Sequence, residues 1–211
     1  MIKLILYDLD GTLCDCCEWH YLALNDALRE VSGIEINEEE HISTFNGIPT
    51  KKKLQLLIEQ GRIKQEDFEL ICHKKQEYTK GVIKQLAKPD FIKIKLHRQN
   101  RWNNIRSVCV TNSITETAAL ILESTGQLDY MDFVISNECV RRPKPFADGF
   151  IKAFVRAGCY PEECIVVEDS PIGIQAAKAS GANVWEVSGA HEVNWDNFQQ
   201  YMVDLNSGRL K

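Results

Sequence analysis

The sequence predicts an α/β fold, a parallel sheet with helices on both faces and a separate helical domain inserted after the first strand. From Ser107 onward, short apolar segments alternate with helical patterns, which is typical of a parallel sheet covered on both sides. About a hundred residues separate the first apolar segment from the second. Because this is too long for a single crossover helix, we expect an inserted domain there.

The individual elements follow from apolar periodicity and from the glycines that end each pattern. Strands are expected at Lys3–Tyr7, Ser107–Thr111, Asp132–Ile135, Cys164–Val167 and Asn183–Val187. Helices of the insert are expected at Glu18–Val31, Glu38–Phe45, Thr50–Glu59 and Gln65–Ala87, and later helices at Thr115–Ser124, Asp148–Gly158 and Ile172–Ser180. The predicted organisation is a core of residues 1–14 and 89–211 with a helical domain over residues 15–88.

Composition excludes several classes of protein. The 211 residues are 44% hydrophobic and 26% charged, as in an ordinary globular chain, and the net charge of -5 gives no basic footprint for nucleic acid or an anionic membrane. Residues 51–106 are locally rich in Lys and Arg, which we interpret mainly as a solvated helical face. No apolar run could span a bilayer, and the first strand reaches an acidic pair too early for a signal peptide. We therefore expect a cytoplasmic protein with no membrane partner.

Eight cysteines raise the question of a disulfide framework or a metal site. Cys109 and Cys164 lie in apolar strand segments, where a thiol behaves as a small hydrophobe. Cys14 and Cys17 have no second pair of ligands at a recognisable spacing. Reduced, mostly buried thiols are the better interpretation.

Polar side chains with phosphoryl-transfer chemistry follow three of the predicted strands. Asp8 and Asp10 follow the first, Thr111 ends the second, and Asp169 follows the strand that begins at Cys164. Functional loops gather at the carboxyl ends of strands in open parallel sheets. A carboxylate there can attack phosphorus, and a second one can protonate the leaving oxygen and later deprotonate the attacking water or alcohol.

A site of this kind needs positive charge, because both the nucleophile and the phosphate are anionic. Magnesium held by Asp8 and Asp169 would supply it, and Lys144, between two prolines, could add a second cation. Thr111 could donate its hydroxyl to a phosphoryl oxygen. Each residue alone is commonly a surface acid, a turn or a solvated lysine, but their order after successive strands favours the catalytic interpretation.

The chain resembles the haloacid dehalogenase-like (HAD) superfamily, in the branch with β-phosphoglucomutase-like enzymes and phosphoglycolate phosphatases. The resemblance covers nearly the whole chain and rests on four motifs: Leu4–Leu13, Val108–Ser113, Arg142–Pro145 and Ile165–Ala177. It implies a Rossmann-like parallel sheet core with an α-helical cap, and places the first strand between the second and the fourth.

The resemblance also implies roles for individual residues. Asp8 would be the nucleophile, Asp10 the general acid/base that also gives its carbonyl to Mg²⁺, and Asp169 a metal ligand, with Glu168 supporting it at the metal site. Thr111 and Lys144 would hold the phosphoryl group. Substrate-binding positions are expected at Gly11, His20, Gly47, Lys51, Asn112 and Ser113. For His20, a solvent-facing position on a helix is the alternative.

The expected function is that of a magnesium-dependent phosphatase acting on a small phosphate ester through an aspartyl-phosphate, as a monomer or weak homodimer. Asp10 argues against a dehalogenase, because a departing halide needs no proton. A hexose phosphomutase of the β-phosphoglucomutase type is the alternative. Such enzymes tend to carry an arginine just after the glycine of the cap loop, which grips the second phosphate, and this chain has Pro49 and Thr50 there instead. A noncatalytic phospho-acceptor or interaction module is the remote alternative. Pro89–Arg106 and Ala147 also depart from the family pattern, outside the proposed chemistry.

Overall fold

The computed structural model describes residues 1–45 and 48–209, and the chain folds as two compact units. One unit joins Met1–Asp15 to Lys88–Lys211, and the other is Cys16–Ala87. The first contains the sheet, with strands β1 (Leu4–Tyr7), β2 (Arg106–Val110), β3 (Val134–Ile135), β4 (Cys164–Glu168) and β5 (Asn183–Glu186).

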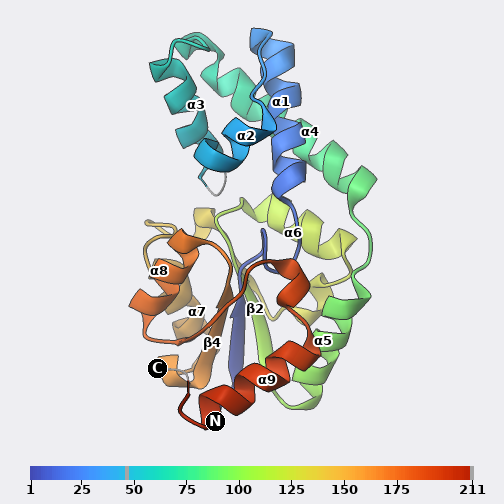
Figure 1. The fold of residues 1–211 in the computed structure, drawn as a ribbon, viewed down its shortest axis with the longest axis vertical. Coiled ribbons are helices and arrows are strands. Elements are labelled where there is room, and N and C mark those ends of the chain that lie inside the picture. The colour runs from blue at the N-terminus through green and yellow to red at the C-terminus, as the bar shows by residue number, and fades with distance from the viewer. Residues whose placement is uncertain (46–47, 210–211) are drawn as a thin grey trace. The chain divides into compact units, whose positions relative to one another are not determined.

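All described pairings in this sheet are parallel, in the order β3-β2-β1-β4-β5 (Figure 1). Strand β1 is central, with Leu6 in register with Val108 of β2 and Val166 of β4. This confirms the predicted Rossmann-like α/β class and the position of the first strand. Because the strands run in one direction, their carboxyl ends meet at one edge of the sheet.

Helices α7 (Asp148–Ala157) and α8 (Pro171–Ser180) cover one face of the sheet (Figure 1). Alternate residues of the strands point to this face, because side chains alternate along a strand. The buried core between them consists of Leu4, Leu6, Val108, Val110, Ile135, Phe150, Ala153, Phe154, Cys164, Val166, Ala176 and Ala177. Helix α8 begins where the Ser170 hydroxyl accepts a hydrogen bond from the Gly173 N–H and caps the helix.

The opposite face packs against α5 (Phe91–Trp102) and α9 (Trp195–Asn206), which the sequence did not predict. Both helices begin at side-chain caps, Asp90 and Asn194. Tyr7 of β1 accepts a hydrogen bond from the Asn100 side chain of α5 at 2.8 Å, and Trp185 of β5 stacks on Tyr201 of α9. Helix α6 (Thr115–Ser124) packs by β3. Short 3₁₀ helices complete the unit at Leu128–Tyr130, Asn137–Cys139, Pro161–Glu163 and Ala190–Glu192.

The second unit is helical, as predicted. It contains α1 (Cys17–Ser32), α2 (Glu38–Glu40), a π-helix (His41–Phe45), α3 (Thr50–Glu59), a 3₁₀ turn (Gln65–Asp67) and α4 (Phe68–Leu86). The helix predicted over Glu38–Phe45 is thus split into α and π segments. Its own buried core consists of Leu24, Ala27, Leu28, Ile36, Phe45, Leu54, Leu57, Ile63 and Ile71.

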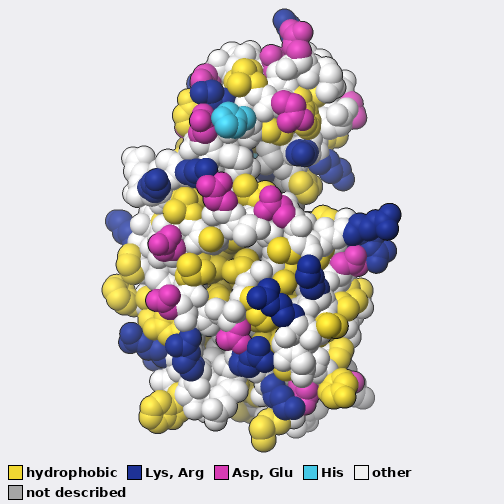
Figure 2. All heavy atoms as spheres, turned by 180° about the vertical axis from the view of Figure 1, so that it is seen from behind, with side chains coloured by type: hydrophobic (Ala, Val, Ile, Leu, Met, Phe, Trp, Pro, Cys, Tyr) yellow, Lys and Arg dark blue, Asp and Glu magenta, His cyan; other side chains and the backbone are white. Residues whose placement is uncertain are grey.

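The charged side chains of the surface are mixed in sign. On the face shown in Figure 2, Lys and Arg side chains are interspersed with Asp and Glu side chains. Over the described residues, no helix has the length and apolar character needed to cross a membrane.

All eight cysteines are free; Cys14, Cys16, Cys109 and Cys164 are buried and the other four are half-buried, so the prediction of mostly buried thiols holds for half of them.

His97 of α5 lies in the core of the first unit and makes stability depend on pH. Its Nε2 lies 3.0 Å from Gln127 Oε1, and burial lowers its pKa from 6.5 to about 4. Between these two values the unfolded chain binds a proton that the folded chain excludes. Stability is therefore lost as the pH falls through this window, by up to about 1.4 kcal/mol per pH unit.

We expect His97→Gln to flatten the decline of the free energy of unfolding between pH 6.5 and 4. Urea denaturation across this range measures the slope, and His191→Gln, at an exposed histidine, serves as the matched control. Equal slopes for wild type and His97→Gln would contradict the assignment of this pH dependence to His97.

Candidate active site

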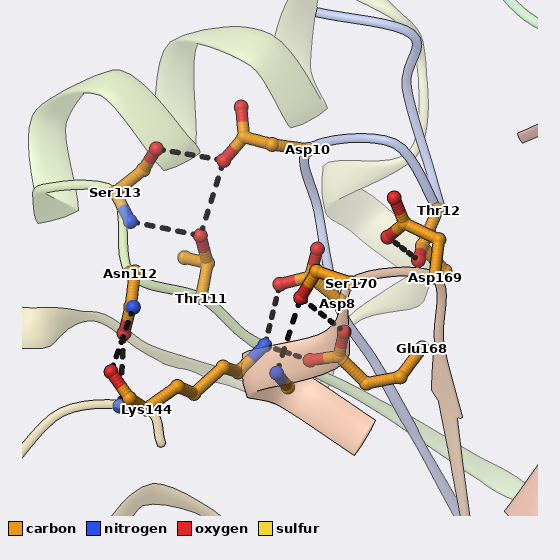
Figure 3. Close-up of polar contacts among 11 residues, drawn as sticks. Asp8, Asp10, Thr12, Thr111, Asn112, Ser113, Lys144, Glu168, Asp169 and Ser170 are labelled. Atoms are coloured by element: carbon orange, nitrogen blue, oxygen red, sulfur yellow. Dashed lines mark hydrogen bonds and ion pairs between the residues drawn. The ribbon is translucent and has the colours of Figure 1, made fainter. Parts of the chain in front are cut away.

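Three chain segments converge at the carboxyl edge of the sheet, each directly after or at the end of a strand (Figure 3). Asp8 follows β1, and its N–H donates to Val167 O of β4 at 3.0 Å. Thr111 follows β2, and Glu168 is the last residue of β4. Residues separated by more than a hundred positions thus lie side by side because β1 has β2 and β4 as neighbours.

Lys144 is the cation at this edge and lies in the segment before α7. Its Nζ donates to Asp8 Oδ1 at 2.5 Å and to Glu168 Oε1 (Figure 3). All three side chains are buried, with exposed fractions of 8% for Lys144, 6% for Asp8 and 0% for Glu168. Two carboxylates and one ammonium therefore share a space from which water is largely excluded.

The charges in this cluster shift one another's ionisation. Burial raises the pKa of Asp8 well above its usual range, and the neighbouring Glu168 carboxylate adds to the shift while Lys144 opposes it. For Lys144, burial lowers the pKa, but the carboxylates of Asp8 and Glu168 outweigh burial and raise it. Lys144 is thus a permanent ammonium. Asp8 gains its carboxylate form most readily with further positive charge nearby.

Asn112 fixes the backbone of Lys144. Its Nδ2 donates to Lys144 O at 3.2 Å, and its Oδ1 accepts from Lys144 N at 3.1 Å. Asn112 O in turn accepts from the side chain of Asn137 at 2.8 Å. The predicted substrate residue Asn112 therefore holds the loop that presents the cation.

Asp10 lies at the same edge but makes a separate set of contacts (Figure 3). Its Oδ2 accepts from Ser113 Oγ at 2.8 Å and from Thr111 Oγ1 at 3.3 Å. The Ser113 N–H also donates to Thr111 Oγ1 at 2.9 Å. These bonds orient the Asp10 carboxylate toward the segment after β2, away from the ion pairs of Asp8.

Gly11 and Thr12 shape the loop beside Asp169. The Thr12 hydroxyl donates to Asp169 Oδ1 at 2.8 Å, a contact that the sequence analysis missed. Gly11 has a φ of +94°, and a Cβ at this position would overlap the Asp169 carboxylate. Burial raises the pKa of Asp169, and the Thr12 hydrogen bond opposes that shift. Glycine is therefore required here both for conformation and for space.

Carboxylate oxygens of Asp8, Glu168 and Asp169 lie within 4.8 Å of one another, close enough for one divalent cation to contact all three. Such hard oxygen ligands suit Mg²⁺. Glu168 is already engaged by Lys144 and accepts from Ser170 Oγ at 3.2 Å, so Asp8 and Asp169 offer the better ligand atoms. The Asp10 carboxylate lies outside this group of three. The prediction for Asp10 was that its backbone carbonyl, and not its carboxylate, binds Mg²⁺. The residues present thus fit the predicted ion.

The remaining predicted residues belong to the helical unit. On α1, His20 is half-buried, with Nδ1 3.3 Å from the Nζ of buried Lys75, so it is not simply solvent-facing. Lys75 was not predicted, because a lysine on an amphipathic helix ordinarily indicates a solvated face. Lys51 is exposed on α3. The predicted residue Gly47 lies outside the described residues.

Comparison with known proteins identifies the family of the chain. The model of the family described as haloacid dehalogenase-like hydrolase matches residues 5–187. Fructose-1-phosphate phosphatase YqaB of Escherichia coli (strain K12) is 29% identical over 190 residues, covering 87% of this chain and 95% of that protein. β-Phosphoglucomutase of Bacillus subtilis (strain 168) is 26% identical over 195 residues, covering 85% and 80%.

Solved structures share the fold. CbbY from Rhodobacter sphaeroides in complex with phosphate aligns with a TM-score of 0.78 at 21% identity, covering 88% of this chain and 86% of that one. A predicted phosphoglycolate phosphatase from Haemophilus somnus aligns with a TM-score of 0.80 at 19% identity, covering 95% and 98%.

Gly173, in the first turn of α8, gives a test of how tightly Glu168 is held. A Cβ on Gly173 would overlap the Glu168 carboxylate. We expect Gly173→Ala to displace that carboxylate from Lys144 and to lower the free energy of unfolding by about 1–3 kcal/mol, as measured by urea denaturation.

Gly81→Ala is the matched control, because nothing lies within 4 Å of the position of its Cβ in the interior of α4. That substitution should stabilise the chain by about 0.5–1 kcal/mol. A neutral or stabilising Gly173→Ala would contradict the close packing of Glu168 against α8.

Proposed function

Because the chain belongs to the haloacid dehalogenase-like hydrolases and is a phosphoric monoester hydrolase, we propose that it is a magnesium-dependent phosphatase of a small phosphorylated metabolite. The observation that carries the proposal is the buried cluster in which Lys144 joins Asp8 to Glu168, with the Asp10 carboxylate at the same sheet edge. Nucleophile, cation and acid/base are the three groups that the reaction requires.

In the proposed reaction, Asp8 attacks phosphorus and takes the phosphoryl group as an aspartyl-phosphate. Asp10 protonates the leaving oxygen, and its hydrogen bonds from Thr111 and Ser113 orient it for that transfer. As a carboxylate, Asp10 then deprotonates the water that attacks the aspartyl-phosphate. Splitting one displacement into two avoids a direct attack by water on the ester.

Lys144 and Thr111 are proposed to hold the phosphoryl oxygens. The Lys144 ammonium already contacts Asp8 Oδ1, so it would neutralise charge where the Asp8 carboxylate and the phosphate meet. The backbone of the turn at Gly11 and of the segment Asn112–Ser113 would add donors around the phosphate. Glu168 keeps Lys144 in place and acts on the phosphate only through it.

Asp8 and Asp169 would hold Mg²⁺, with the Asp10 carbonyl as a further ligand and Glu168 at the edge of the site. When bound, the ion supplies the positive charge that offsets the repulsion between the Asp8 carboxylate and the phosphate. The raised pKa of Asp8 supports this need, since burial and Glu168 both disfavour its charged form.

We propose that the helical unit Cys16–Ala87 is a cap that closes over bound substrate and excludes water. His20, Gly47 and Lys51 would be its substrate-binding positions. Sugar phosphates are the proposed substrate class, supported by the relative described as a fructose-1-phosphate phosphatase. We also propose a cytoplasmic location, which the eight free cysteines support. The proposed protein is a monomer or weak homodimer that binds no nucleic acid.

Asp8→Asn tests the nucleophile. The amide keeps the size of the side chain but cannot form a stable phosphoryl intermediate, so we expect phosphate release from an aryl phosphate with Mg²⁺ to fall at least about a thousandfold. Chelation of the metal should abolish wild-type release, and added Mg²⁺ should restore it.

The matched control is Asp129→Asn, at an exposed aspartate of the 3₁₀ helix Leu128–Tyr130, whose backbone carbonyl accepts from Arg101 of α5 at 2.7 Å. Its rate should equal that of wild type, and circular dichroism should be the same for both variants. Substantial phosphate release by Asp8→Asn would refute the proposed nucleophile.

The relative described as β-phosphoglucomutase favours a second candidate, transfer of phosphate within a sugar phosphate. A panel of phosphorylated metabolites, assayed for both free phosphate and isomerised product, separates the two. We expect free phosphate with sugar phosphates and no isomer. Isomerisation without net phosphate release would establish the mutase, and activity on no ester would favour the noncatalytic alternative.

A further inference from the structure

Gln127 is a buried glutamine that connects the loop after α6 to the turn that follows β1. Its side chain is fully buried. Its Nε2 donates to Leu13 O at 3.2 Å and to Thr125 Oγ1 at 2.9 Å, and its Oε1 lies 3.0 Å from His97 Nε2. All three partners are buried as well. The amide depends on these hydrogen bonds, because burying an unpaired amide is unfavourable.

The orientation of this amide follows from its partners. The Thr125 hydroxyl donates to Ile121 O at 2.8 Å, which uses its one proton, so toward Gln127 it accepts. A backbone carbonyl such as Leu13 O accepts too. The Gln127 nitrogen therefore faces these two acceptors, and the amide oxygen accepts from the His97 N–H. Both amide protons and the oxygen are paired, which fixes the side chain in one orientation.

Leu13 belongs to the turn Leu9–Cys14, which the chain makes after β1. Leu9 O accepts from the N–H groups of Leu13 and Cys14 at 3.0 and 2.9 Å. These bonds join residues within the turn. The bond from Gln127 joins the turn to a distant segment of the same compact unit.

The same turn carries groups that the proposed reaction needs. Asp10 is the proposed acid/base, and its backbone carbonyl is a proposed Mg²⁺ ligand. The Thr12 hydroxyl donates to Asp169 Oδ1 at 2.8 Å, and Gly11 lies against the same carboxylate. Because Thr12 and Leu13 are neighbours in the chain, a displacement of Leu13 is passed to Thr12 and through it to Asp169.

We propose that Gln127 is a positioning residue for phosphoryl transfer, because its hydrogen bond to Leu13 O holds the turn Leu9–Cys14 in place. Its effect on the reaction rests on the proposed function, whereas the hydrogen bond itself does not. A displacement of about 1 Å in a catalytic group can lower a rate on the order of a hundredfold. A single bond that fixes the turn can therefore have a large effect without touching the substrate.

Hydrogen exchange tests the bond independently of activity. The experiment compares the full-length wild type with Gln127→Leu, in which the side chain has a similar size but cannot donate to Leu13 O. Exchange is read by mass spectrometry on peptides that cover residues 9–15 and on peptides of β4. We expect the increase in rate over residues 9–15 to exceed that of β4 at least about tenfold, because the turn opens locally. A general loss of stability would speed both segments equally.

Thr125→Val is the matched control. It keeps the shape of the side chain and removes the second acceptor of Gln127, but leaves the donation to Leu13 O in place. We expect only Gln127→Leu to give fast exchange in the turn. Should Gln127→Leu fail to fold by circular dichroism, Gln127→Met decides in its place, because methionine is unbranched and fills irregular space. Exchange in the turn that rises no more than in β4, or equally in both variants, would overturn the proposal.

The Mg²⁺ dependence of the rate separates positioning from stability. Phosphate release from an aryl phosphate is measured with the folded variants over a range of Mg²⁺ concentrations. We expect Gln127→Leu to lower kcat about tenfold and to raise the half-saturating Mg²⁺ concentration about threefold, with the KM for the ester within about twofold of wild type. Thr125→Val should match wild type in all three quantities.

A purely structural role would lower only the amount of active protein. The half-saturating Mg²⁺ concentration of Gln127→Leu would then equal that of wild type, and this result would refute the positioning role. Absence of phosphate release from wild type would refute the proposed function and with it the effect of Gln127 on the rate. The exchange experiment decides separately whether Gln127 holds the turn.

Discussion

The structure of the site depends on one constraint, that the buried Lys144 ammonium must have carboxylates around it. Removing an ammonium from water costs several kcal/mol unless charges and hydrogen bonds compensate. Asp8 and Glu168 compensate it, and each comes from the end of a different strand. Because β1 and β4 are parallel neighbours, their carboxyl ends place the two carboxylates side by side. The Asn112 side chain holds the backbone of Lys144 and so positions the ammonium between them.

Much of this arrangement could be predicted from the sequence, because polar residues directly after apolar strand segments are easily recognised as residues at the carboxyl edge of a parallel sheet. Helix α5 could not, because most of its buried residues are polar and several of its apolar residues are exposed. Lys93, His97 and Asn100 are buried in the structure, while Phe91 is 77% and Trp102 is 86% exposed. Hydrophobic periodicity is the main signal for a helix, and in α5 this signal is weak, because Leu96 is its one fully buried apolar residue. Hydrogen bonds replace apolar contact there, for example from Lys93 Nζ to Ala190 O at 2.6 Å.

Within the site, the sequence identified side chains but not their partners. Thr111 was expected to bind a phosphoryl oxygen, and its hydroxyl is found on Asp10. Thr12 was expected only to shape a turn, and it holds Asp169. Both threonines are short donors whose partners depend on distances of a few tenths of an ångström, and residue type and spacing do not carry that information. The separation of Asp10 from the ion pairs of Asp8 is likewise a property of three dimensions alone.

Gly11 has a consequence for how this sequence can change over time. Two independent restrictions act on it, a φ of +94° and the Asp169 carboxylate in the place of a Cβ. Relieving the overlap by shortening or moving Asp169 would still leave a side chain in a conformation that L residues rarely adopt. Evolutionary drift can therefore alter the residues around the loop, but the loop remains anchored to a residue with no side chain.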